Sequence, residues 1–68
     1  MDLNAWQYNA IDHTSDAQLL AQLAWCSRTD HEGAPLYTTW GWRIYVPAWA
    51  MTCALAERQD EEDRQSDS

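Results

Sequence analysis

Two cysteines and two histidines are the side chains in this chain that could act as a nucleophile, a base or a metal ligand. Cys26 or Cys53 with His13 or His31 would supply a thiol and an imidazole, the pair on which nucleophilic cysteine chemistry depends. Both cysteines, however, fall on apolar faces of predicted helices, where structural thiols are commoner than activated ones. The C-x-x-C, H-E-x-x-H and H-x-x-x-H spacings that are typical of zinc sites do not occur. We therefore expect a protein that is not an enzyme, with no catalytic residues, no metal and no cofactor.

Aromatic side chains with a polar tip form the more informative group. The chain has five Trp and three Tyr but no Phe. Trp, Tyr and Arg dominate protein-binding hot spots because they combine contact area, rigidity and a polar tip. All three types gather between positions 37 and 49, as Tyr37, Trp40, Trp42, Arg43, Tyr45 and Trp49. We expect these six residues to contact a partner protein; the alternative is that they serve only the core or a homodimer interface.

The charge of the chain is acidic and unevenly distributed. Eleven Asp and Glu residues outnumber four Arg and no Lys, giving a net charge of −7. Direct nucleic-acid binding is not expected, because it needs a basic face. Six of the acidic residues lie in residues 57–68, mostly in a predicted flexible tail that would steer the protein towards a basic patch on its partner. Rigidly spaced carboxylates would instead favour a DNA mimic.

Neither a secretory signal nor a membrane span is predicted. Residues 1–12 lack the basic and apolar stretches of a signal peptide. Residues 36–56 carry a single charge, but Gly41, Pro47 and the alternation of the first half argue against one membrane helix. We therefore expect a cytoplasmic protein that does not bind membranes and whose two thiols are reduced and buried.

Two helices are expected in the first half of the chain. Residues 2–11 favour a short helix that starts at Asp2 or Asn4, although the alternation in this stretch would also suit a strand. Ser15 and Gln18 have the spacing of a capping box, which predicts a helix over 16–28. A polar loop over 29–35 should follow.

The second half combines an alternating stretch with a helix. Residues 36–46 alternate strictly, which predicts either one long strand or a hairpin that bends at 40–42. Pro47 suits the first turn of a helix over 48–58, and the flexible tail would occupy 59–68. The core or a dimer interface should contain Leu19, Leu20, Leu23, Met51 and Leu55.

These elements predict a small single domain over 1–58, α+β or mostly α, with about three short helices and one strand or hairpin. We expect a homodimer, for two reasons. So short a chain cannot easily enclose all its indoles, and a lone strand needs partners at its edges.

The expected function is binding: a small acidic module that blocks a surface on a larger protein. In its size, its acidity and its lack of catalytic motifs, the chain is similar to the small acidic accessory proteins with which bacteriophages inhibit host machinery or host defence systems. Two alternatives stay open. One is the DNA mimic, and the other is an assembly subunit whose aromatic residues serve only oligomerisation.

Overall fold

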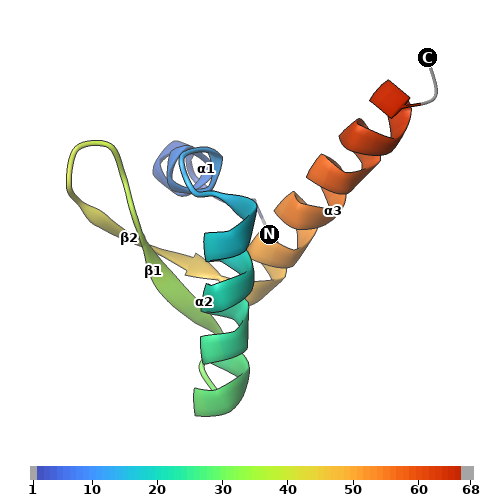
Figure 1. The fold of residues 1–68 in the computed structure, drawn as a ribbon. Helices are drawn as coiled ribbons and strands as arrows, with labels where there is room; N and C mark the ends of the chain where they lie inside the picture. The colour runs from blue at the N-terminus through green and yellow to red at the C-terminus, as the bar shows by residue number, and fades with distance from the viewer. Residues whose placement is uncertain (1, 67–68) are drawn as a thin grey trace.

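The described part of the chain, residues 2–66, forms three helices and one β-hairpin in a computed structural model. The elements are α1 (Ala5–Asp12), α2 (Asp16–Thr29), β1 (Gly33–Tyr37), β2 (Arg43–Pro47) and α3 (Ala48–Ser66). In Figure 1, α1 lies between the tip of the hairpin and α3, and the C-terminal half of α3 extends away from the other elements. The fold is therefore α+β, one of the two predicted classes.

Helix α1 is fixed by its N-terminal cap, which settles the predicted ambiguity of residues 2–11 in favour of a helix. The Asn4 side chain accepts a hydrogen bond from the Gln7 backbone N–H, and Gln7 Oε1 accepts one from the Asn4 N–H. This reciprocal pair satisfies two backbone donors that the first helical turn leaves free. The same Gln7 amide donates through Nε2 to the Tyr45 carbonyl, 3.1 Å away. Gln7 therefore also ties α1 to the free edge of β2.

Helix α2 begins where the sequence predicts. The Ser15 side chain accepts a hydrogen bond from the Gln18 N–H at 3.3 Å. The helix runs one residue further than predicted, to Thr29, and Asp30 ends it in the left-handed conformation (φ 58°). Asp tolerates this conformation better than most residues because its short polar side chain bonds locally.

The alternating stretch forms a hairpin, and its first strand starts earlier than predicted. β1 and β2 pair antiparallel, from Gly33 opposite Pro47 to Tyr37 opposite Arg43. Residues 33–35 are therefore strand and not the loop that was predicted. A strand is possible here because of the position that Pro35 takes in the ladder. Backbone hydrogen bonds also join the two residue pairs that flank this ladder. The Thr38 N–H donates to the Trp42 carbonyl, and the Ala48 N–H donates to the Glu32 carbonyl. Because bonded pairs alternate along an antiparallel ladder, Pro35 and Pro47 occupy positions whose missing N–H would point away from the partner strand.

The hairpin also changes the case for a dimer. Each strand is paired within the same chain, so no second copy is needed to supply backbone partners. Pro35 interrupts the donors on the free edge of β1, and the Tyr45 carbonyl on the edge of β2 accepts from Gln7. Both devices discourage edge-to-edge pairing. The homodimer remains a prediction, supported now by the exposed aromatic residues alone.

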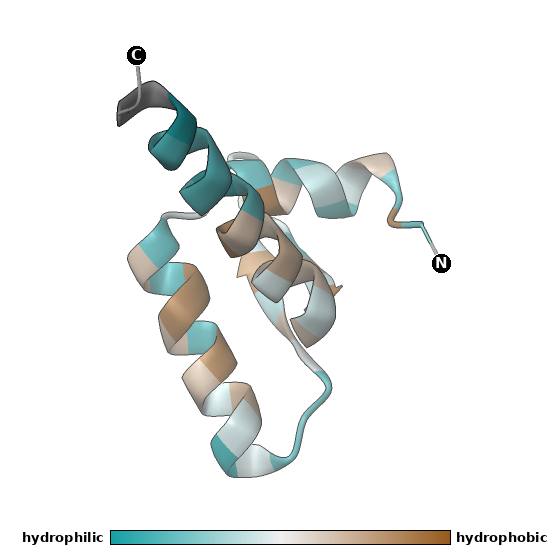
Figure 2. Ribbon diagram, turned by 90° about the vertical axis from the view of Figure 1, so that its right-hand side faces the viewer, coloured by the Kyte–Doolittle hydropathy of each residue, from teal (hydrophilic) through white to brown (hydrophobic). Residues whose placement is uncertain are grey.

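Helix α3 continues through most of the segment predicted as a tail. It runs unbroken to Ser66, and the last two residues of the predicted tail lie outside the described part. Arg, Gln and Glu are strong helix formers, and Gln59 Nε2 donates to Asp63 Oδ1 one turn later, at 3.4 Å. Figure 2 shows the hydropathy of α3 changing along its length, from apolar beside the rest of the fold to hydrophilic beyond it.

The core is built from small and aliphatic side chains. Its buried members are Ala10, Ile11, Leu19, Cys26, Ala34, Leu36, Val46, Ala50 and Met51. Of the residues predicted for the core or a dimer interface, Leu19 and Met51 are fully buried, and Leu23 and Leu55 pack against the cluster. Leu20 is 58% exposed, because a helical step of about 100° separates it from Leu19; it is therefore not in the core, and its place in a dimer interface stays a prediction.

The two thiols have different surroundings. Cys26 is buried in the core, as predicted, whereas Cys53 is exposed, and both are free. The burial expected for Cys53 is therefore wrong. This part of α3 faces α1 across an open groove, so nothing packs over the thiol.

Candidate functional site

The aromatic side chains define the candidate site, because none of them is in the core. All eight Trp and Tyr residues are at least 39% exposed. Large apolar side chains contribute most to stability when they are buried, so a chain of this size that leaves all of them accessible is unusual. The eight residues gather mainly around three features, which we call the tryptophan cleft, the outer hairpin face and the α1–α3 groove.

The tryptophan cleft lies between α1 and the tip of the hairpin. It is a hollow of about 600 Å³ lined by Trp6, Trp40, Trp42 and Ile44. The indoles of Trp6 and Trp40 meet edge to face, with their centroids 5.3 Å apart and their planes at 78°. This arrangement suits the charge distribution of aromatic rings. The cleft is therefore an apolar, open pocket whose walls come from two distant segments of the chain.

Thr38 and Gly41 fix the backbone that carries the two indoles of the hairpin tip. The Gly41 N–H donates to the Thr38 carbonyl at 3.1 Å, and Gly41 has φ 82°. A turn of this kind followed by a left-handed glycine is a common three-residue hairpin connection. The buried Thr38 hydroxyl accepts from the N–H groups of Trp40 and Trp42, at 3.3 and 3.2 Å. One threonine thus holds the backbone on both sides of the turn.

The outer hairpin face carries the other aromatic residues of the sheet. Register places Tyr37 opposite Arg43 and Pro35 opposite Tyr45, so these four side chains share the face that points away from the core. The Arg43 guanidinium lies 5.8 Å from the centroid of the Tyr37 ring, within range of a cation–π contact. Tyr45 packs closely over the backbone of Gly33, where an added Cβ would lie 2.6 Å from the Tyr45 hydroxyl.

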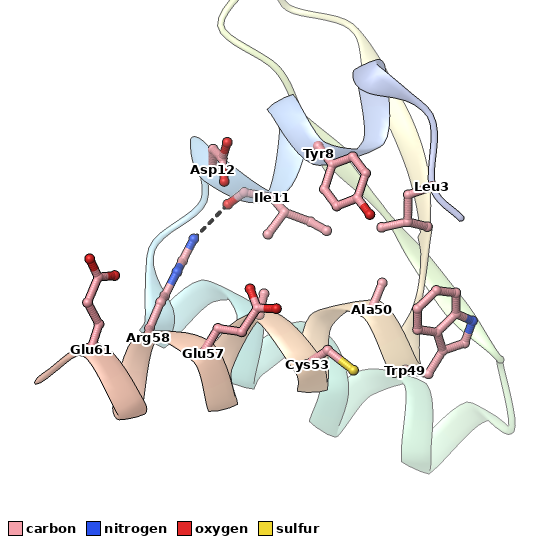
Figure 3. A pocket seen from close by; sticks show the side chains of 11 residues that line it. Leu3, Tyr8, Ile11, Asp12, Trp49, Ala50, Cys53, Glu57, Arg58 and Glu61 are labelled. Atoms are coloured by element: carbon pink, nitrogen blue, oxygen red, sulfur yellow. Dashed lines mark hydrogen bonds between the residues drawn. The ribbon is translucent and has the colours of Figure 1, made fainter. Parts of the chain in front are cut away.

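The α1–α3 groove is a hollow of about 420 Å³ between the first and last helices (Figure 3). Its apolar end is formed by Leu3 and Tyr8 on one side and Trp49 on the other. Cys53 lies in the middle, and the far end carries the carboxylates of the α1 terminus and of α3. Those acidic side chains are Asp12, Glu57 and Glu61.

Arg58 closes the acidic end of this groove by linking α3 to the α1–α2 corner. Its guanidinium donates to the carbonyls of Ile11 and Thr14, at 2.8 and 3.0 Å, and to Asp16 Oδ1 at 2.6 Å. The two carbonyls belong to the end of α1 and the connection that follows, where backbone acceptors lack helical partners. A planar guanidinium can satisfy several of them at once. The sequence gives no sign of this role, because Arg58 is 42 to 47 residues away from its partners.

The structure divides the six predicted contact residues among these features. Trp40 and Trp42 line the tryptophan cleft with Ile44, and Tyr37, Arg43 and Tyr45 share the outer hairpin face. Trp49 lines the α1–α3 groove instead. Trp6, Tyr8 and Thr38 also belong to these features and were not among the predicted contact residues. The prediction of a helix over residues 2–11 included Trp6 and Tyr8, but no local pattern indicated that they would lie beside Trp40 and Trp49.

Trp25 belongs to none of the three features. Its ring stacks on the His31 imidazole, with the centroids 4.8 Å apart and the planes at 16°. His31 follows the end of α2, and its backbone N–H donates to the Cys26 carbonyl at 3.1 Å. Both contacts of His31 are therefore with helix α2, whose C-terminus it covers.

Within residues 2–66, no helix is long and apolar enough to cross a membrane. The same residues contain no group of three or more His, Cys, Asp or Glu side chains that could hold a metal ion. Comparison with protein-family models, with curated proteins and with solved structures found no match to this chain.

Proposed function

We propose that this protein is a small non-enzymatic binding module that docks on a larger protein and blocks the surface it covers. The contact surface consists of the tryptophan cleft and the outer hairpin face. The observation that carries the proposal is the exposure of every aromatic side chain, which is at least 39%. Exposed apolar clusters on small proteins mark interaction sites.

The composition of this surface supports protein recognition in particular. Trp, Tyr and Arg are the types that lose most affinity when an interface is truncated, and the surface offers all three. The cleft is a pocket in which a partner could seat an apolar side chain. The Thr38 and Gly41 turn fixes the backbone of Trp40 and Trp42 before binding, which reduces the backbone entropy lost on association.

The net charge of −7 supports a partner that has a basic patch beside its binding site. Acidic side chains attract a basic patch over distances of about a Debye length, and they raise the association rate more than the affinity. A host protein that handles nucleic acid would offer such a patch. Inhibition of host machinery or of a host defence system, as with the bacteriophage proteins of similar size and charge, is the role we propose for the bound state.

Affinity capture with matched variants tests this function. The tagged protein, the W40A/W42A variant and the L20A variant are incubated with lysate of the host cell, and captured proteins are quantified by mass spectrometry. Leu20 is as exposed as the indoles but lies on α2, away from the cleft, so it is the matched control. A partner retained by the protein and by L20A but lost by W40A/W42A supports the proposal. Equal capture by all three contradicts it.

The DNA mimic remains the second candidate because of one observation. The acidic segment is helical to Ser66, so its carboxylates follow a regular spacing. A chain ending at Gln59 removes most of them and keeps Arg58. A DNA mimic would lose inhibition in this truncated chain, whereas binding through the aromatic surface would slow only in its association.

A further inference from the structure

We propose that the α1–α3 groove is a second interface, which binds a basic amphipathic helix of a partner protein. The apolar side of that helix would lie against Trp49, Tyr8 and Leu3. Its Arg or Lys residues would reach Glu57, Glu61 and Asp12. This inference concerns a different surface from the tryptophan cleft and does not depend on the function proposed above.

The shape of the groove favours an elongated occupant. Trp49, Cys53, Glu57 and Glu61 all line it, and their spacing of four residues keeps them on adjoining turns of α3. From Trp49 to Glu61 the helix rises about 18 Å at roughly 1.5 Å per residue. Figure 3 shows the opposite wall, where Leu3, Tyr8 and Ile11 face α3. A helix of about three turns matches this length, and helices commonly bind in apolar grooves between helices.

The charge of the groove selects a basic occupant. Asp12, Glu57 and Glu61 stand at one end, and none of them has an ion pair within residues 2–66. Two cations lie near them. Arg58 also lines the groove, but its guanidinium is engaged by two carbonyls and Asp16. Arg64 lines a neighbouring hollow with Glu57 and Glu61, and it forms no ion pair with them within residues 2–66. The carboxylates are therefore available to cations from outside. All three are exposed, so their attraction for such cations should weaken as salt rises.

A second copy of this chain is a poor occupant for the same reason. Each copy carries a net charge of −7 and only four Arg residues, one of which is Arg58. Two acidic α3 helices brought together would repel each other. A foreign segment with an apolar face and two or three basic residues at one end complements both ends of the groove.

Two synthetic peptides test the charge preference. The first is a labelled helical peptide of twelve to fourteen residues with Leu at positions i, i+3 and i+4, followed by three Arg on the next two turns. The second has Gln in place of each Arg. Fluorescence anisotropy measures the affinity of both for the full chain. We expect the Arg peptide to bind at least tenfold more tightly and to lose affinity as salt rises. Equal binding of the two peptides, or no binding of the first, would overturn the proposal.

Matched charge variants locate the binding. E57Q/E61Q removes two carboxylates from the groove, and E32Q/E62Q removes two that do not line it. Both variants change the net charge equally. We expect a fivefold to tenfold loss of affinity for the first and less than a twofold loss for the second. Equal losses would show attraction by net charge alone and would contradict a site in the groove.

Cys53 provides a footprint that needs no substitution. Its thiol is exposed in the middle of the groove, whereas Cys26 is buried. The rate of modification by a thiol reagent should therefore report on Cys53. We expect saturating Arg peptide to slow that rate at least fivefold. An unchanged rate under conditions in which anisotropy shows binding would place the peptide elsewhere and overturn the proposal.

Discussion

The indole of Trp6, in the first turns of α1, meets the indole of Trp40 at the tip of the hairpin, with centroids 5.3 Å apart and an interplanar angle of 78°. Thirty-four residues separate the two positions in the chain. The contact is the aromatic link between α1 and the turn, and both rings keep more than a third of their surface accessible. Trp6 and Trp40 can therefore both stabilise the fold and contact a partner protein.

A double-mutant cycle should measure this link. We expect W6A and W40A each to destabilise the fold, with a coupling of about 0.5–1.5 kcal/mol, the range found for aromatic pairs. Urea unfolding of the protein, both single variants and the double variant gives the four free energies. Additive losses would show that the rings do not stabilise each other in solution.

Replacing Tyr37 and Arg43 should separate binding from folding. Both side chains lie on the outer hairpin face, and their cation–π contact is exposed and therefore weak, about 0.5–1 kcal/mol. We expect Y37A/R43A to remain folded by circular dichroism but to lose partner capture. Unchanged capture by the folded variant would exclude this face from the contact surface.

Arg58 should matter more for stability than the ion pair it forms. Its carbonyl contacts involve the partly buried end of α1, whereas the Asp16 side chain is 62% exposed. We expect R58Q to cost about 2–3 kcal/mol, because carbonyls at the end of α1 lose a charged donor. D16N should cost at most about 1 kcal/mol, as exposed ion pairs do. Thermal or urea unfolding compares them, and equal losses would assign the stabilisation to the ion pair.

The two glycines should respond to alanine for different reasons. A Cβ on Gly33 would lie 2.5 Å from the Val46 carbonyl oxygen and 2.6 Å from the Tyr45 hydroxyl, so the strands must shift. We expect G33A to cost about 1–3 kcal/mol and to displace Tyr45. Gly41 has open space around it but φ 82°, so G41A should cost about 1–2 kcal/mol of backbone strain. NMR shifts of Tyr45 in both variants check the distinction, since only G33A should move them.

The mass of the protein in solution tests the predicted homodimer. With every aromatic residue exposed, we expect light scattering at micromolar concentration to give about twice the 7.9 kDa of one chain. Because the tryptophan cleft is the surface proposed to contact the partner protein, W40A/W42A should keep the mass of the unmodified protein. A mass near 8 kDa for the unmodified protein would refute the dimer. If W40A/W42A becomes monomeric but still captures the partner, the aromatic residues serve oligomerisation, and the assembly role is favoured over blocking.

Local signals in the sequence located several elements correctly. The Ser15 cap marks the start of α2, and the alternation of residues 36–46 predicts the separation of Tyr37, Arg43 and Tyr45 from Ile44. These features depend on near neighbours in the chain, through backbone capping and the two-residue period of a strand. The start of β1 was predicted three residues too late, and the reason is also local. Gly33 and Pro35 are typical of loops, and only the pairing with β2 shows that Pro35 occupies an edge position that needs no donor.

The sequence by itself determined the acidity, the small number of basic residues and the list of aromatic residues, because these follow from composition. Where those aromatic residues lie was decided by the tertiary structure. Small aliphatic side chains proved sufficient to fill the space between the sheet and the helices, so the indoles were left outside. The three surfaces bring together residues such as Trp6 with Trp40, or Tyr8 with Trp49, that no local pattern relates. Their proximity depends on how α1 packs between the hairpin and α3, with Gln7 and Arg58 holding it on its two sides.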